Sequence, residues 1–216
     1  MKQTSSTMKT KKAIYLTLAV LLASILISTI INAFAEIGYN KKRNLTVAFY
    51  NVENLFDTIN TPGGNDAEFT PEGKNKWTEE RYNKKLDDIS KVLSSINKKE
   101  LPEIIGLCEI ENREVLDDLV KTKLLSGGNY KIEQFESPDF RGIDCALLYR
   151  PDEFEVIKSS PIKVGFADDL KFTTRDILYV KGETKNGEEF HIFVNHWPSR
   201  IGGLDQTVPK RIAVAR

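Results

Sequence analysis

Three short segments of the 216-residue sequence end in side chains that could carry out chemistry. They are residues 49–56 (FYNVENLF), 106–112 (GLCEIEN) and 194–200 (VNHWPSR). In each, an apolar, strand-like run is followed by amides, carboxylates or an imidazole, and a strand end can hold a polar group in place beside an open loop. Carboxylate and amide oxygens suit a hard cation such as Mg²⁺, and a histidine beside them suits proton transfer or contact with phosphate. Together the segments predict a metal-dependent phosphoesterase site.

The carboxylates of Glu53 and Glu109 and the amide of Asn51 are the candidate metal ligands. Asn51 and Glu53 have the same parity along their strand, so we expect both side chains to leave its end on one side. The alternative is a polar turn that only closes the strand. Glu109 follows the apolar run 104–108, where an unpaired carboxylate is costly and a cation would offset that cost. The alternative for Glu109 is a capping role at the start of the next helix.

His196 is the candidate acid, base or phosphate donor. It follows the predicted strand at residues 189–195, and Trp197 and Pro198 restrict the chain directly after it. The sequence contains one other histidine, His191, which lies in the middle of the same strand and is interpreted as structural.

Hydrophobic periodicity predicts the elements that must position these side chains. A loop rich in Thr, Pro, Gly and Asn at residues 58–76 follows the first strand, and a loop of that length beside candidate ligands indicates function. Thr78 and Asn112 are predicted to cap two amphipathic helices. The predicted strands are residues 45–50, 103–108, 130–136, 144–149, 154–159, 175–182 and 189–195, and another helix is predicted within 208–216. Alternating strands and helices followed by a meander predict a layered α/β domain.

Four motifs, in this order, resemble the endonuclease/exonuclease/phosphatase family. They are residues 51–55 (NVENL), 108–109 (CE), 142–150 (GIDCALLYR) and 195–200 (NHWPSR). The family includes deoxyribonuclease I-like nucleases, inositol polyphosphate 5-phosphatases and bacterial sphingomyelinases. The resemblance covers residues 45–216 and implies an α/β fold, a four-layer sandwich in which two packed mixed sheets are flanked by helices.

The resemblance also implies a role for each candidate residue. Glu109 would bind Mg²⁺ or Mn²⁺ directly, with Asn51 near both metal and phosphate and Glu53 at the acidic or amide position beside them. His196 would contact the scissile phosphate. Arg175 would contact the phosphate too, or would equally well be a surface arginine. The implied metal ligands are therefore Glu109, Glu53 and Asn51, and the implied catalytic residues are His196, Asn51 and Arg175.

The sequence departs from the family pattern after Arg200, where neither an Asp-x-Asn segment nor a late Asp-His pair follows. In the family these segments position the attacking water and complete the acid–base set. We therefore expect residues 36–216 to be the N-terminal portion of the domain and to be inactive as this fragment. The full-length parent is expected to be a Mg²⁺-dependent phosphodiesterase or phosphatase. The alternative function is a non-catalytic exported binding module on the same scaffold.

Residues 1–35 have the pattern of a secretory signal peptide. Four lysines without an acidic residue precede the apolar run 13–32, and the small-x-small pattern AFA follows at 33–35. The alternative is an uncleaved membrane anchor, since the apolar run is long enough to cross a bilayer. Both interpretations predict an exported domain that is periplasmic, extracellular or tethered to the outer face of the inner membrane.

The composition of the domain leaves its substrate open. Without the leader, the sequence has 27 basic and 31 acidic side chains, and this net charge of −4 provides no global attraction to polyanions. The candidate substrates are nucleic acid, nucleotide, phospholipid and inositol phosphate, and the complete protein is expected to be a monomer. Cys108 and Cys145 lie in apolar runs and are interpreted as small buried hydrophobes rather than as a disulfide.

Overall fold

The computed structural model describes residues 15, 18, 20–32, 44–61, 64–166, 172–200 and 202–215. The chain divides into two compact units, Met1–Asn44 and Leu45–Arg216. Residues 20–32 of the first unit are helical. Within the described ranges, no helix combines the length and the apolarity that a membrane span needs. The lysines and the cleavage pattern of the predicted leader lie outside the described residues, so cleavage and export stay predictions.

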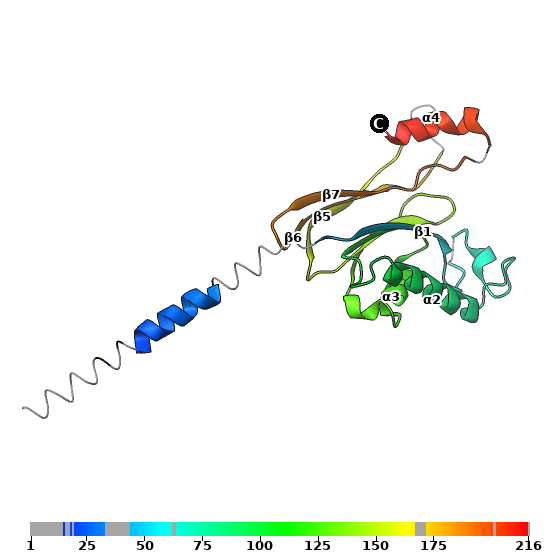
Figure 1. Ribbon diagram of the computed structural model, residues 1–216. Coiled ribbons are helices and arrows are strands. Elements are labelled where there is room, and N and C mark those ends of the chain that lie inside the picture. The colour runs from blue at the N-terminus through cyan, green and yellow to red at the C-terminus, as the bar shows by residue number, and fades with distance from the viewer. Residues whose placement is uncertain are drawn as a thin grey trace, which may run out of the picture. The chain divides into compact units, whose positions relative to one another are not determined.

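A four-stranded mixed sheet forms the centre of the second unit (Figure 1). Its strands are β1 (Val47–Leu55), β2 (Ile104–Ile110), β3 (Lys131–Gln134) and β4 (Asp144–Tyr149), in the order β1-β2-β4-β3. β1 runs parallel to β2, and the other two pairings are antiparallel. β2 is buried at six of its seven positions and β4 at every position, as expected for strands covered on both faces.

Two helices cover one face of this sheet. α2 (Glu79–Ser95) and α3 (Arg113–Lys121) begin at the predicted caps, because the Thr78 and Asn112 side chains each accept a main-chain N–H of the first turn. Their apolar stripes pack on the sheet in one buried cluster. That cluster includes Leu86, Ile89, Leu93, Ile105, Leu107, Val115, Leu116, Leu119, Ala146 and Leu148.

A three-stranded antiparallel sheet packs on the other face. It contains β5 (Phe154–Ile162), β6 (Ile177–Thr184) and β7 (Glu189–Val194), in that order. A second buried cluster joins the two sheets and includes Ile104, Cys108, Leu147, Phe154, Leu178, Val180 and Val194. The predicted sandwich of two packed sheets with flanking helices is confirmed.

Gly106 lets the two sheets approach each other closely below the candidate site. A Cβ atom at this position would lie 3.2 Å from Cδ2 of Phe49 and 3.3 Å from Cγ2 of Val194. The glycine therefore provides the space in which β7 passes β2. As a result, the residues that follow β7 reach the carboxyl end of β2.

The remaining short elements lie in the connections. Two 3₁₀ helices, η1 (Ala67–Phe69) and η2 (Ser126–Gly128), follow β1 and α3 in sequence. The last helix, α4 (Leu204–Ala215), begins four residues earlier than predicted and contains Pro209. Figure 1 shows α4 beyond the end of β7. The predicted strand 175–182 is observed at 177–184, so Arg175 lies in the loop before it.

Cys108 and Cys145 are direct partners across β2 and β4. Both are buried free thiols, which confirms their interpretation as small core residues. Burial raises the pKa of each thiol to about 12. Neither thiol is therefore ionised to a useful extent near neutral pH.

Candidate active site

Both β1 and β2 depart from regular strand geometry where they end. The register of each strand shifts, between Asn51 and Leu55 in β1 and between Cys108 and Ile110 in β2. Glu53, Asn54 and Glu109 have φ values of 56°, 63° and 66°, which non-glycine residues adopt rarely and at a cost of about 1–3 kcal/mol each. Bulges of this kind redirect side chains and are common beside active sites.

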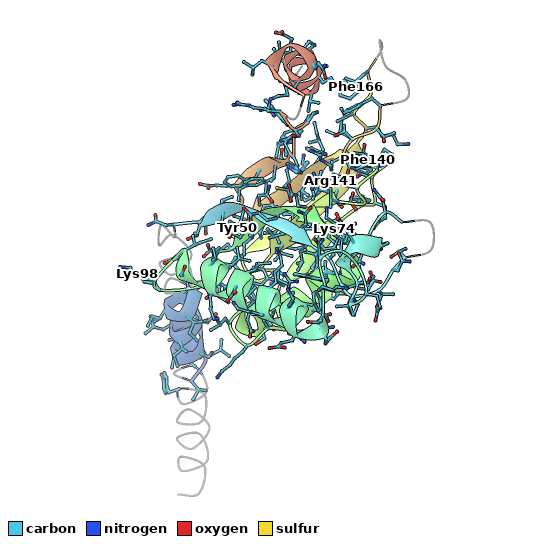
Figure 2. All side chains as sticks on the ribbon, turned by 90° about the vertical axis from the view of Figure 1, so that its right-hand side faces the viewer. Tyr50, Lys74, Lys98, Phe140, Arg141 and Phe166 are labelled. Atoms are coloured by element: carbon cyan, nitrogen blue, oxygen red, sulfur yellow. The ribbon has the colours of Figure 1, made fainter. Side chains whose placement is uncertain are left out.

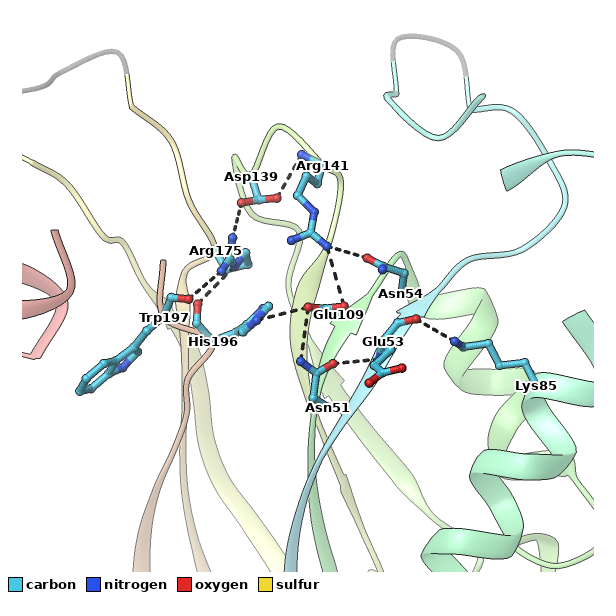
Figure 3. A network of polar contacts seen from close by, with 10 residues as sticks. All are labelled: Asn51, Glu53, Asn54, Lys85, Glu109, Asp139, Arg141, Arg175, His196 and Trp197. Atoms are coloured by element: carbon cyan, nitrogen blue, oxygen red, sulfur yellow. Dashed lines mark hydrogen bonds and ion pairs between the residues drawn. The ribbon is translucent and has the colours of Figure 1, made fainter. Parts of the chain in front are cut away.

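Glu109 lies at the centre of a polar network at these strand ends (Figure 3). Its Oε1 accepts a hydrogen bond from Nδ2 of Asn51 at 3.3 Å and lies 3.4 Å from Nε2 of His196. Its Oε2 lies 3.8 Å from a guanidinium nitrogen of Arg141. The Glu109 side chain is 12% exposed, so one nearly buried carboxylate meets an amide, an imidazole and a guanidinium.

Arg141 is held over this carboxylate by Asn54 of β1 and by Asp139 of its own loop. One of its terminal nitrogens donates to Oδ1 of Asn54 at 2.6 Å, and its main-chain N–H donates to Oδ1 of Asp139 at 3.0 Å. Figure 2 shows Phe140 and Arg141 together on this loop between β3 and β4. The Arg141 side chain remains about one third exposed, so it is accessible to an anion.

Arg175 fixes the chain that carries His196. Its three guanidinium nitrogens donate to the carbonyls of His196 at 3.2 Å and Trp197 at 3.0 Å, and to Oδ2 of Asp139 at 2.9 Å. The side chains of Arg175 and Asp139 are 6% and 1% exposed. The alternative of a surface arginine is therefore wrong, because this guanidinium is buried and fully engaged. Its predicted contact with phosphate stays a prediction.

His196 lies directly after β7, as predicted, and its ring is mostly buried. Burial lowers the pKa of His196, and the positive charge of Arg175 lowers it further. The ring is therefore neutral near pH 7 and has one N–H to donate. Its buried Nδ1 has no hydrogen-bond partner within the described part of the chain.

Glu53 enters the network through its backbone. Its main-chain N–H donates to Oδ1 of Asn51 at 2.8 Å, and its carbonyl accepts Nζ of Lys85 at 2.7 Å. The Glu53 residue is exposed at the end of β1. Burial lowers the pKa of Lys85, against the opposing effect of the Glu53 and Glu109 carboxylates. The regular alternation of side chains along β1 ends at Asn51, where the register shifts. The expectation that the Asn51 and Glu53 side chains leave the strand on the same side, which assumed regular alternation, therefore loses its basis.

The structure thus brings Asn51, Glu109 and His196 into direct contact and places Arg175 behind them. Sequence reasoning missed Arg141 and Asp139. The only sequence signal was their position beside Gly142, immediately before a buried strand. Gly142 has a φ of 66°, which turns the chain back into β4.

The donor set fits a hard cation in part. The Glu109 carboxylate is a suitable ligand, and its contacts at 3.3–3.8 Å are long enough to be exchanged for a cation. The Asn51 oxygen is engaged by the N–H of Glu53, so Asn51 here orients Glu109. In the described ranges, no group of three or more His, Cys, Asp or Glu side chains is arranged to bind a metal. The ligand roles of Glu53 and Asn51 stay predictions.

A cavity of about 370 Å³ adjoins the network on the side of α4. Arg141 and Arg175 line it together with the aromatic rings of Phe140 and Phe172. The partly exposed guanidinium of Arg141 beside apolar rings forms an environment suited to a phosphate that carries an organic group.

Comparison with protein families gives a match that covers most of the chain. The model described as "Endonuclease/Exonuclease/phosphatase family" matches residues 46–216. A comparison with curated proteins gives no match.

Several solved structures are similar to the chain. An endonuclease/exonuclease/phosphatase from Bacteroides vulgatus is 18% identical over 72% of this chain and 53% of that chain, with a TM-score of 0.47. A Bacteroides thetaiotaomicron mannosyl-6-phosphatase is 18% identical over 69% and 50%, with a TM-score of 0.45. TDP2 of D. rerio, complexed with a single-strand DNA product, is 16% identical over 79% and 52%, with a TM-score of 0.47. The chain thus spans about half the length of these three structures.

Proposed function

Because the chain belongs to the endonuclease/exonuclease/phosphatase family, we propose that the protein hydrolyses a phosphate ester with a divalent cation, Mg²⁺ or Mn²⁺, bound at Glu109. The observation that carries this proposal is the nearly buried Glu109 carboxylate in contact with Asn51, His196 and Arg141. A carboxylate beside cationic and amide donors can bind a cation on one side while the donors bind the substrate anion.

Glu109 would be the direct ligand of the cation and would be oriented by Asn51. The Glu53 carboxylate would complete the set, directly or through a water. When bound, the cation would neutralise the negative charge that grows on the phosphoryl oxygens. A hard cation of this kind is expected to keep several waters, so few protein ligands are needed.

The chain's own residues would bind and orient the phosphate. Arg141 is exposed enough to contact a phosphate oxygen, and Asn54 restricts its guanidinium. His196 would donate its Nε2–H to another oxygen. Arg175 would act as a positioning residue, because it binds the carbonyls on both sides of the His196–Trp197 peptide. Donors fixed before the substrate arrives need little reorganisation during the reaction.

We propose that residues 36–216 alone bind the cation and the phosphate ester without turnover, and that the intact protein hydrolyses the ester. The protein is proposed to be exported by its N-terminal segment. The substrate is proposed to be a nucleic acid, nucleotide, phospholipid or inositol phosphate.

The test is a cation-dependent hydrolysis assay on the intact protein. Bis-(p-nitrophenyl) phosphate and p-nitrophenyl phosphate separate diesterase from monoesterase activity, and single-stranded DNA, a sugar phosphate and phospholipid vesicles extend the panel. We expect activity with Mg²⁺ or Mn²⁺ and none after treatment with EDTA. His196→Ala should lower it by about 10²–10⁴-fold while the melting temperature stays nearly unchanged. Phosphate ester binding without hydrolysis in any arm would instead support a non-catalytic binding module.

A further inference from the structure

A second cavity, of about 410 Å³, lies between the loop after β1 and the start of α3. Five carboxylate side chains line it, and the lining residues within the described ranges include no lysine or arginine. The carboxylates belong to Asp57, Asp66, Glu111, Glu114 and Glu136. Such a concentration of one charge is unfavourable unless a cation or a proton offsets it.

Asp66 and Glu111 are the buried members of this set. They are 4% and 7% exposed. One oxygen of each is bound by the main chain: Oδ2 of Asp66 accepts the N–H of Thr61 at 3.0 Å, and Oε2 of Glu111 accepts the N–H of Asp57 at 2.7 Å. The other oxygens, Asp66 Oδ1 and Glu111 Oε1, are buried and have no hydrogen-bond donor in the described part of the chain.

The two carboxyl groups line the same cavity, and each brings one buried oxygen without a donor to it. Two carboxylate oxygens cannot share a buried space unless something positive lies between them. Because each carboxylate is already oriented through its other oxygen, the pair is preorganised for an occupant.

Gly64 leaves space beside this pair. A Cβ atom at Gly64 would lie 3.3 Å from Oδ1 of Asp66 and 3.1 Å from the carbonyl oxygen of Thr61. A side chain there would crowd both oxygens. The Thr61 carbonyl also accepts the main-chain N–H of Gly64 at 2.9 Å, which fixes its direction. The loop therefore presents a main-chain oxygen and a carboxylate oxygen to the same small volume.

We propose that this cavity binds a calcium ion through Asp66 Oδ1, Glu111 Oε1 and the Thr61 carbonyl, with water completing the coordination. Calcium suits the site better than magnesium because it accepts carboxylate and main-chain oxygens in irregular geometry, whereas magnesium requires a near-ideal octahedron. The ion joins the loop after β1 to the end of β2 and so stabilises the strand ends that carry the candidate active site. The proposal does not depend on the proposed function.

The experiment measures calcium binding and thermal stability in the full chain carrying Glu109→Gln, which removes the other candidate cation site. Titration calorimetry with CaCl₂ should show one site with a Kd of about 10⁻⁴–10⁻³ M, the range of sites that work at extracellular calcium levels. Calcium at ten times this Kd should raise the melting temperature by several degrees, and magnesium at the same concentration by clearly less.

Glu111→Gln and Asp66→Asn should each abolish the calcium-dependent shift, and Gly64→Ala should reduce it. Glu155→Gln, on the exposed side of β5, is the matched control and should keep the full shift. The Gln side chain at position 111 can donate to Asp66, so this variant is expected to fold. If the Glu109→Gln chain shows no calcium-dependent shift, the proposal is overturned, and a higher melting temperature on adding Glu111→Gln would then indicate a proton shared between the two carboxylates. An equal shift with magnesium would overturn the assignment to calcium.

Discussion

Glu109 and Glu111 lie two residues apart at the end of one strand, and the charges around them have opposite signs. Glu109 contacts an amide, an imidazole and a guanidinium, and its neighbourhood attracts anions. Glu111 faces Asp66 in a cavity lined by carboxylates. Burial raises the pKa of Glu111 to about 8, and the nearby charges of Asp57 and Asp66 also raise it.

The comparison shows that residue type and strand position do not determine what a carboxylate does. The donors around it decide whether it stays charged and what it binds. At Glu109 the neighbouring cations favour a phosphate beside the carboxylate. At Glu111 the neighbouring carboxylates favour a positive occupant and disfavour any anion.

The strongest test of this difference is Glu109→Gln in the intact protein. The change keeps the hydrogen-bonding shape and removes the charge that would bind the cation. We expect kcat/KM for phosphate ester hydrolysis to fall by at least about 10³-fold, equivalent to roughly 4 kcal/mol of transition-state stabilisation. Steady-state kinetics with saturating Mg²⁺ measures it, with Glu155→Gln as the control. Activity within tenfold of the wild type would remove Glu109 from the cation site.

Arg175→Met tests how much the buried Arg175–Asp139 ion pair contributes to the stability of the region around Glu109. It leaves the Asp139 carboxylate buried without its ion-pair partner, which should cost about 3–5 kcal/mol of unfolding free energy. Urea denaturation followed by circular dichroism measures the loss. The double variant Arg175→Met/Asp139→Asn should regain a substantial part of it, because no buried charge remains. If the double variant is no more stable than the single one, the lost carbonyl hydrogen bonds are the main cause.

Arg141→Met tests direct contact with phosphate. A charged hydrogen bond contributes about 1.5–3 kcal/mol, so we expect KM for the phosphate ester to rise about 10- to 100-fold. The melting temperature should change little, since the side chain is about one third exposed. Arg141→Lys should recover part of the affinity because it restores the charge without the planar fork. A large stability loss with unchanged KM would make Arg141 a structural residue.

The smallest effect is expected at Asp144. This buried carboxylate accepts hydrogen bonds from neutral donors and has no cationic partner among the contacts described. It accepts Nε2 of Gln134 at 3.0 Å and the N–H of Ser137 at 2.9 Å, and burial still raises its pKa to about 7. The folded protein therefore binds this proton more tightly than the unfolded chain does. Its stabilising effect is complete below the unfolded pKa near 4 and is lost as the pH rises to about 7.

Asp144→Asn should remove this dependence. Its melting temperature relative to wild type should rise by a few degrees between pH 5 and pH 8. Differential scanning calorimetry at several pH values measures the trend, and Glu155→Gln should run parallel to wild type. A constant difference across that range would show that Asp144 is charged throughout.

The sequence was sufficient to predict the parts of the site that follow from strand ends. Asn51, Glu109 and His196 each terminate an apolar run, and strands that neighbour each other in a core bring such residues together. The elements and a layered α/β domain were predictable for the same reason, since periodicity records burial. The sandwich of two sheets was expected from the resemblance to the family. Cap residues Thr78 and Asn112 mark helix starts because their side chains accept local N–H groups.

The rest depends on contacts that no local pattern records. The direction of Glu53 depends on a positive φ and a register shift, and a non-glycine residue gives no sign of either in the sequence. Arg141 and Asp139 lie in an aperiodic loop, and their partners are 87 and 36 residues away along the chain. The pairing of Asp66 with Glu111 similarly joins a loop to a strand end.

Cys108 and Cys145 face each other across β2 and β4, so their reaction with an alkylating reagent can report when the interior of the sandwich opens. A thiol with a pKa of about 12 reacts slowly with an alkylating reagent, and burial excludes the reagent as well. Labelling at Cys108 or Cys145 therefore requires the central strands to separate. Pulse labelling followed by mass spectrometry would measure the rate of that separation at native cysteines, so no new residue has to be introduced. Comparing Cys108→Ala with Cys145→Ala would show whether the two strands open together or in sequence.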